Sequence, residues 1–149
     1  MLGELNDIQI ENILASQAFG RIACTNGKQA YILPVNYVYD GKYIICQTKD
    51  EKKVEIMRNN PKVCFEVDII ATMANCQSVV LSGTFHELKG NPSAKAREYL
   101  TNHLWPLLTC SSIHPHEHQV FGDVDDSERV KPIIYRIKIR KKTGTFEKE

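Results

Sequence analysis

The alternation of apolar and polar positions along the chain predicts short β-strands, joined by turns and a few short helices. The first element is a helix over residues 6–16, where Asn6 followed by Gln9 has the pattern of a capping box. Apolar side chains then fall near one side of that helix, at Leu5, Ile10, Ile13 and Leu14. We therefore expect one face of the helix to pack on the rest of the protein.

Two hairpin signals follow this helix. The segment Phe19–Thr25 is followed by Asn26-Gly27, and Gln29–Tyr39 is followed by Asp40-Gly41. Both dipeptides supply the positive φ that two-residue hairpin turns require. The sequence thus predicts a meander of three antiparallel strands that ends near Thr48.

The middle strand of this meander has apolar residues on both faces and contains a proline. One face carries Ala30, Ile32, Pro34, Asn36 and Val38, and the other carries Tyr31, Leu33, Val35, Tyr37 and Tyr39. Both faces are expected to be partly covered, as in a barrel wall. Because Pro34 has no N–H, we expect a sheet edge, a bulge, or a place where something other than a strand approaches the backbone.

The rest of the chain predicts a helix, two strands, a further helix and a closing strand. In chain order these are a helix over Asp50–Asn59 stopped by Asn60-Pro61, strands over Lys62–Ile70 and Ser78–Leu88, a helix starting at Asn91-Pro92, a long loop over Ser111–Lys131, and a strand over Ile133–Ile139 with a tail from Lys141. About six strands with three short helices indicate a mainly β, antiparallel barrel with helices at its ends.

Length and composition narrow the class of protein. Residues 1–149 are expected to form one domain, and a net charge of +1 argues against a nucleic-acid-binding protein. Polar residues interrupt the longest uncharged stretch, between Ile69 and Glu87, and no secretory signal opens the chain, so we expect a cytoplasmic protein without a membrane span. The cysteines lack a CxxC pair and are expected to be reduced core residues: Cys24, Cys46, Cys64, Cys76 and Cys110.

Two segments carry candidate chemistry. Lys52 and Lys53 fall at the start of the second helix, where cations oppose the helix dipole unless an anion such as phosphate lies between them and the free amides. A solvated lysine face is the simpler interpretation. The run His114-Pro115-His116-Glu117-His118 has poor spacing for a metal site and favours an exposed loop. Common hydrolase, NTPase and dinucleotide-fold motifs are absent, so an enzyme of this sequence would depend on a cofactor.

Four segments, in one order, resemble a known family. They are Phe19–Cys24, Tyr31–Tyr39, Gln47–Lys53 and Arg58–Asp68, and the match continues through Ser78–Gly83 and Tyr135–Ile139. The chain resembles the FMN-binding split-barrel family, and more narrowly the nitroimidazole-resistance branch of the pyridoxamine 5′-phosphate oxidase-like proteins.

This resemblance implies a six-stranded antiparallel split β-barrel with short flanking helices, which forms a homodimer and holds FMN at the subunit interface. The residues that it brings to FMN are Leu33, Pro34, Val35 and Asn36 along the isoalloxazine ring, Gln47 and Thr48 beside the ring and the ribityl chain, Lys52 and Lys53 at the phosphate, and Ser78 at the polar edge of the ring. The implied activity is that of an FMN-dependent oxidoreductase with a small-molecule substrate, and no residue is nominated as catalytic.

Alternatives stay open at this point. Relatives with nitroimidazole reductase activity usually have a histidine where this chain has Cys46, and a thiol cannot reproduce the hydrogen bonding of an imidazole. Similar barrels hold haem, for which His114, His116 or His118 could supply an axial ligand in a binding or sensing protein. A purely structural role is the least specific alternative.

Overall fold

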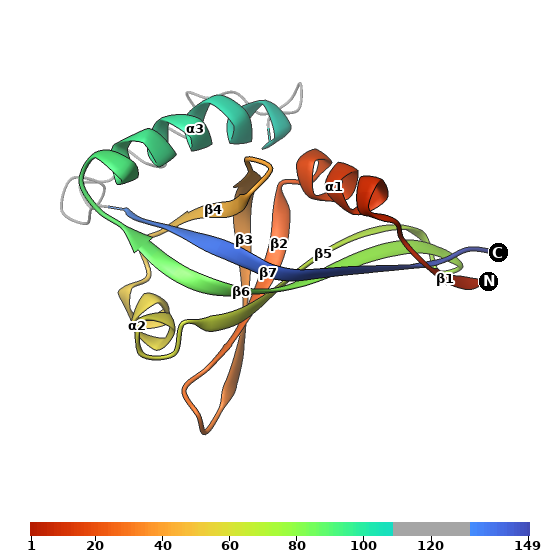
Figure 1. Ribbon diagram of the computed structural model, residues 1–149, viewed down its shortest axis with the longest axis horizontal. Helices are drawn as coiled ribbons and strands as arrows, with labels where there is room; N and C mark the ends of the chain where they lie inside the picture. Colours follow the sequence, from red (N-terminus) through yellow and green to blue (C-terminus); the bar gives the residue numbers. More distant parts are fainter. Residues whose placement is uncertain (109–131) are drawn as a thin grey trace.

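The computed structural model describes residues 1–108 and 132–149, which form seven strands and three helices. In chain order they are β1 (Leu2–Glu4), α1 (Asp7–Ser16), β2 (Phe19–Thr25), β3 (Ala30–Tyr39), β4 (Tyr43–Thr48), α2 (Glu51–Asn59), β5 (Lys62–Thr72), β6 (Asn75–Leu88), α3 (Asn91–Leu108) and β7 (Ile133–Glu147). Six antiparallel strands close into a ring in the order β7-β4-β3-β2-β5-β6, and β1 pairs with the end of β7 (Figure 1). The mainly β, six-stranded antiparallel class is confirmed.

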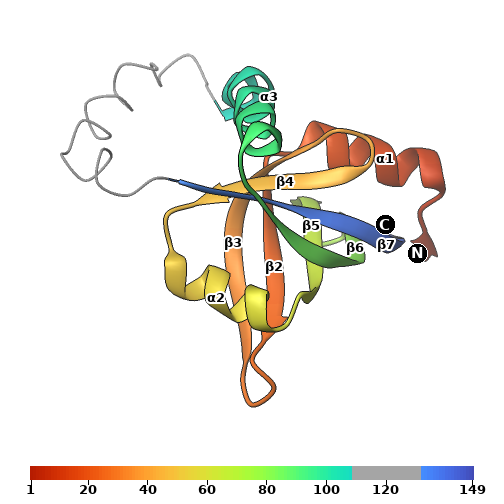
Figure 2. The same ribbon diagram turned by 60° about the vertical axis from the view of Figure 1, so that its left-hand side comes forward.

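The helices begin where the sequence signals predict. Asn6 and Gln9 form the capping box of α1: the Asn6 side chain accepts from the Gln9 N–H at 2.9 Å, and the Gln9 side chain accepts from the Asn6 N–H at 2.8 Å. Asp50 caps α2. Helix α3 follows Gly90, whose carbonyl accepts its first helical hydrogen bond. In both views α1 and α3 lie on one side of the ring and α2 lies on the opposite side (Figures 1 and 2).

Both hairpin turns differ by one residue from the prediction. Gly27 and Gly41 both have φ of +93°. In the described segments only glycines have a positive φ, so Asn26 and Asp40, predicted as turn centres, do not adopt it. In the first turn Asn26 pairs with Gln29, so the two central residues are Gly27 and Lys28. The Asn26 side chain accepts from the N–H groups of Lys28 and Gln29, at 2.9 and 2.8 Å, and this bonding fixes Asn26 before the turn.

The ring encloses an apolar core. Tyr37 and Phe65 meet edge to face at 4.9 Å between ring centroids, and the Tyr37 hydroxyl donates to the Leu14 carbonyl of α1 at 2.7 Å. A second apolar cluster lies between α3 and the outer side of the sheet: Ala18, Val38, Ile45, Ala96, Leu100, Leu104 and Ile134. Helix α3 therefore covers one part of the outer surface of the ring.

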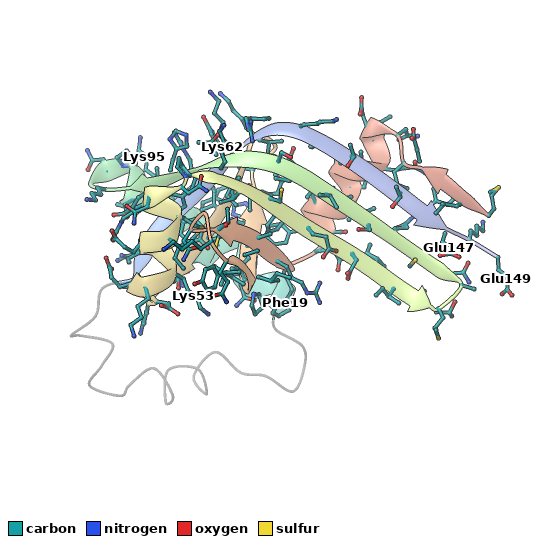
Figure 3. All side chains as sticks on the ribbon, turned by 90° about the horizontal axis from the view of Figure 1, so that it is seen from below. Phe19, Lys53, Lys62, Lys95, Glu147 and Glu149 are labelled. Carbon is teal, nitrogen blue, oxygen red and sulfur yellow. The ribbon has the colours of Figure 1, made fainter. Side chains whose placement is uncertain are left out.

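Strands β5, β6 and β7 extend beyond the ring as a long arm. Strand β7 continues to Glu147, paired with β6 and β1, so the predicted tail from Lys141 is wrong. This segment is polar on its outer face, which hid its strand pattern. The arm carries both chain ends, and Glu147 lies at the end of the molecule opposite Lys53 (Figure 3).

The cysteine prediction holds only in part. Cys24 and Cys46 are buried, whereas Cys64 is exposed because alternation along β5 directs its side chain outward. Cys76 is half-buried, and Cys110 lies outside the described residues, as does the predicted loop over residues 111–131.

None of the helices in residues 1–108 and 132–149 combines the length and the hydropathy that crossing a membrane requires.

Candidate cofactor site

The ladder between β3 and β4 opens partway along both strands. Strand β4 pairs with β3 only at Tyr37–Tyr39, whereas β2 pairs with β3 along Ala30–Asn36. The edge of β3 that faces away from β2 therefore has no strand partner over Ala30–Asn36 in the described part of the chain. Gln47 and Thr48, the last two residues of β4, lie beyond its pairing with β3 and pair with β7 alone.

Pro34 lies on this open edge with its nitrogen directed away from β2. The Tyr37 N–H donates to the Ala18 carbonyl on the β2 side, at 3.0 Å. Backbone groups of successive strand residues point alternately to the two sides, and the β2–β3 register from Ala30 to Asn36 has no bulge. The backbone groups of Pro34 therefore point to the open edge, and its missing N–H costs β3 no hydrogen bond to β2. Of the alternatives expected for Pro34, the structure shows a strand edge without a bulge.

The same alternation separates the four residues predicted along the ring. The backbone groups of Pro34 and Asn36 face the open edge, whereas those of Leu33 and Val35 face β2. The Leu33 side chain is buried in the core, and the Val35 side chain packs against it. Pro34 and Asn36 thus offer the exposed surface of this segment.

The start of α2 brings a carboxylate, a hydroxyl and an ammonium group together. The Asp50 side chain accepts from the Lys53 N–H at 3.3 Å, and its other oxygen lies 3.5 Å from Lys53 Nζ. Thr48 Oγ1 accepts from the Asp50 N–H at 3.0 Å. Asp50 supplies a negative charge at the positive end of the helix dipole and so partly offsets the unfavourable position of Lys53.

Lys52 borders a different surface, because successive helical residues are roughly 100° apart. It lines a depression of about 540 Å³ between α2 and the β2–β3 turn, together with Asn26, Glu55 and Asn60. Lys52 and Lys53 are both exposed in the first turn of α2, as the sequence predicts. Both ammonium groups are therefore accessible to solvent at the start of the helix, with that of Lys53 paired to Asp50.

Ser78 lies apart from the other predicted residues. Strand β6 is separated from β3 by β2 and β5, which is roughly 14 Å along the wall of the closed ring at ~4.8 Å per strand. Ser78 is half-buried and pairs with Asp68 and Thr145. The open edge thus groups Pro34 and Asn36 with Gln47 and Thr48 at the end of β4. Leu33 and Val35 pack toward the core instead, and Lys52 and Lys53 follow in the first turn of α2. Within one chain, Ser78 is not part of this group.

The outer face of β2, β3 and β5 carries apolar side chains that no described element covers. Phe19 is 66% exposed and Ile32 is 71% exposed. The prediction that both faces of β3 are partly covered is therefore wrong for most of the strand. Only Val38, at its end, is buried on this face, because α3 packs over it.

The same outer face carries a charged cluster that was not predicted from the sequence. Arg21 NH1 lies 3.4 Å from the carboxylates of both Glu66 and Asp68, and Arg21 pairs with Pro34 in the β2–β3 register. Burial, and next the neighbouring Asp68, raises the pKa of Glu66, whereas Arg21 acts to lower it. The alternation of Glu66 and Asp68 with buried residues of β5 was the available signal.

Cys46 is enclosed in the core beside this site. Its side chain is fully buried, and burial raises the pKa of its thiol to about 12. The neighbouring Gln47 is exposed, so strand alternation directs the thiol inward, away from the open edge. Cys46 therefore cannot contact a ligand on the outer surface. His114, His116 and His118, the candidate haem ligands, lie outside the described residues.

Comparison with known proteins agrees with this fold. Residues 6–144 match the sequence model of one family, pyridoxamine 5′-phosphate oxidase. An uncharacterised protein of Rhizobium meliloti is 30% identical over 100 residues, which are 67% of this chain but 64% of that protein. The chain therefore matches less than two thirds of the length of this relative.

Two solved structures illustrate the structural similarity. A FAD-binding protein of Mesorhizobium loti has a TM-score of 0.76 and 25% identity, over 100% of this chain and 98% of that one. A candidate 5-nitroimidazole antibiotic resistance protein of Bacteroides thetaiotaomicron has a TM-score of 0.70 and 13% identity, over 98% of this chain and 87% of that one. At such low identity the second likeness concerns the fold alone.

Proposed function

Because the chain belongs to the pyridoxamine 5′-phosphate oxidase family, we propose that it is a homodimeric flavoprotein, an FMN-dependent oxidoreductase of a small-molecule substrate. The observation that carries this proposal is the open edge of β3 at Pro34, bordered by Gln47 and Thr48. A planar ring lying along a strand edge meets backbone atoms there instead of another strand. Bound flavin supplies the electron transfer that the side chains of this protein cannot perform.

The residues around the edge fit a flavin mononucleotide. The backbone of Pro34 and Asn36 would lie along the ring, and Gln47 and Thr48 would offer an amide and a hydroxyl to its polar atoms. Lys52 and Lys53, with the amides of the first turn of α2, would bind the phosphate. FMN ends in a single phosphate of the kind that this site would bind. The Mesorhizobium loti relative is instead described as a FAD-binding protein.

Two observations support the homodimer. The exposed Phe19 and Ile32 lie on an outer face that a second subunit would remove from water. Ser78 lies three strands from β3, and in a homodimer it would be available to a flavin bound at the open edge of the partner chain. A shared interface would therefore complete the site from both subunits.

A cytoplasmic location is part of the proposal. The four cysteines in the described segments are all free, and two of them are not buried. Thiols that stay reduced are typical of the cytosol.

The proposal is tested by the visible spectrum of the purified protein after gel filtration, with FMN, FAD and haem added in separate samples. We expect flavin bands that elute with the protein, and tighter retention of FMN than of FAD. A Soret band without flavin bands, or no retained chromophore, would contradict the proposal.

The oxidoreductase activity needs a second measurement. NADH and NADPH are mixed anaerobically with the flavin-loaded protein, and bleaching of the flavin bands is compared with that of free FMN. Faster bleaching on the protein is expected for at least one donor. Equal rates for bound and free FMN with both donors would contradict an enzyme that uses pyridine nucleotides. Nitroimidazole compounds are then tested as acceptors that restore the bands.

A further inference from the structure

A second pocket lies on the opposite side of β4 and β7 from the core, under the first turns of α3. It has a volume of about 380 Å³, which is within the range of small-molecule sites. Its walls come from the β3–β4 turn, β4, the end of β6, β7 and α3, and include Asp40, Tyr43, Lys95, Tyr99 and Arg136. The open edge of β3 contributes no residue to it, so this pocket is separate from the proposed flavin site.

Arg136 is held in this pocket by an aromatic ring instead of a carboxylate. Its guanidinium carbon lies 4.0 Å from the centroid of the Tyr43 ring, a stacked cation–π arrangement. In the described part of the chain its Nε is buried without a hydrogen-bond partner, and it has no ion pair. A stacked guanidinium keeps its planar edge of N–H groups available for an anion, and carboxylate and phosphate groups match that edge.

The other groups of the pocket favour a negative ligand. Lys95 adds a second positive charge from the second turn of α3 (Figure 3). The residue before α3 is Gly90, which has no side chain to accept from the first helical amides. Asp40 is the one acidic residue of the lining, and its carboxylate accepts from the N–H groups of Lys42 and Tyr43 at 2.8 and 2.6 Å.

The aromatic walls favour a planar ligand. Tyr43 and Tyr99 both line the pocket, together with the apolar side chains of Ile45 from β4 and Leu88 from β6. Tyr99 is fixed by stacking on His103 at 3.9 Å between ring centroids. We propose that this pocket binds a small aromatic molecule that carries one anionic group, with the anion at Arg136 and Lys95 and the ring beside the tyrosines. This ligand site goes beyond the proposed flavin function and does not rest on it.

The test follows backbone amide resonances of the labelled full-length protein during titration with phenyl phosphate. We expect the amide resonances of Tyr43, Asn91 and Lys95 to shift. A second titration with phenyl phosphate, in the presence of saturating FMN, should produce the same shifts. The Arg136→Gln and Lys95→Gln variants should each weaken binding roughly tenfold, because each removes a charge-assisted contact. Lys28→Gln, at the tip of the β2–β3 turn, is the matched control and should bind as the unchanged protein does.

Further titrations separate the two parts of the proposed ligand. Benzyl alcohol has the ring without the charge, and inorganic phosphate has the charge without the ring. Both should bind at least about tenfold more weakly than phenyl phosphate at the same residues. Equal affinity for either probe would overturn the proposal. So would shifts that vanish on adding FMN, because phenyl phosphate would then occupy the flavin site.

Arg136→Lys keeps the positive charge but loses the planar fork. Its affinity should lie between those of the unchanged protein and Arg136→Gln. If Arg136→Gln unfolds the chain, Lys95→Gln carries the same test, because Lys95 is an exposed residue of α3.

Discussion

The outer surface of the ring has two unlike regions, and β3 runs through both. At one end of the strand Val38 is 3% exposed under α3, whereas Ile32, on the same face of the same strand, is 71% exposed. The sequence pattern of β3 is apolar at both positions. The difference therefore comes from what covers the strand: a helix of the same chain in the first region, and no described element in the second.

The two regions of the outer surface differ in whether the same chain covers them. The region under α3 is completed within one chain and adds to the stability of the fold. The region around Phe19 and Ile32 would be completed by a second chain, beside the open edge of β3. A binding site next to an uncovered apolar face is typical of sites that two subunits build together.

The largest effect is expected in the covered region. Ile134 is 1% exposed and packs in the cluster under α3. Ile134→Ala should lower the free energy of unfolding by about 2–5 kcal/mol, because it leaves a cavity in a packed cluster. Urea denaturation measures this loss. Ile8→Ala, at a position of α1 that is 73% exposed, should change the free energy of unfolding by less than ~0.5 kcal/mol. Similar losses for the two variants would contradict the distinction between the covered region and exposed positions.

The uncovered region is tested by placing a charge in it. Ile32→Asp should leave the chain folded but weaken the homodimer by at least about a hundredfold, because a buried unpaired carboxylate is costly. Sedimentation velocity measures the change in the monomer–dimer equilibrium. Ile8→Asp introduces the same charge on a similarly exposed isoleucine and should leave the dimer intact. A dimer that tolerates Ile32→Asp would rule out this face as the interface.

The start of α2, on the opposite side of the ring from α3, carries the phosphate prediction. Lys52→Ala combined with Lys53→Ala should weaken FMN binding by roughly a hundredfold, since two charge-assisted contacts are lost. Quenching of flavin fluorescence gives the dissociation constant. A double variant of two other exposed lysines, Lys28→Ala with Lys62→Ala, is the control. Unchanged affinity in the Lys52 and Lys53 variant would mean that the phosphate binds elsewhere.

The smallest effects concern two glutamates with opposite pKa shifts. The pKa of Glu66, on the uncovered face, is raised by burial, so its charged form costs stability as pH rises through the raised pKa. The pKa of Glu87 is lowered chiefly by the hydrogen bond that it accepts from Arg58. Ionised Glu87 therefore stabilises the fold above the ordinary pKa of 4.5, and this stabilisation is lost as pH falls.

Glutamine variants distinguish the two cases by sign. At neutral pH, Glu66→Gln should raise and Glu87→Gln should lower the free energy of unfolding, each by up to ~1 kcal/mol. Denaturation at acidic and neutral pH measures both changes. If both variants lower stability at neutral pH, the charged form of Glu66 is not unfavourable in the folded protein.

Most strands and all three helices could be predicted from the sequence, because local signals determine them. The capping box at Asn6 and the stop at Asn60-Pro61 act within a few residues. The polar end of β7 was missed because its partners β6 and β1, rather than its own pattern, make it a strand. The position of the turn centres was also missed, since it depends on side-chain bonds such as those of Asn26.

The candidate site was predictable in its parts but not in its arrangement. Pro34 indicated an edge, and Lys52 and Lys53 indicated a helix start, both from the sequence alone. The distance of Ser78 from β3 follows from the strand order β3-β2-β5-β6, which no local pattern specifies. The cluster of Arg21 with Glu66 and Asp68 likewise depends on the pairing of β2 with β5.

The most direct test of a flavin site shared by two subunits is sedimentation velocity of the FMN-loaded protein, followed in the visible absorption band of the flavin. We expect the flavin absorbance to sediment as a single species with twice the chain mass of 17.0 kDa, and Ile32→Asp to release flavin as it dissociates the dimer. Flavin that sediments with a single chain, or that stays bound when Ile32→Asp is monomeric, would contradict a site built by two subunits.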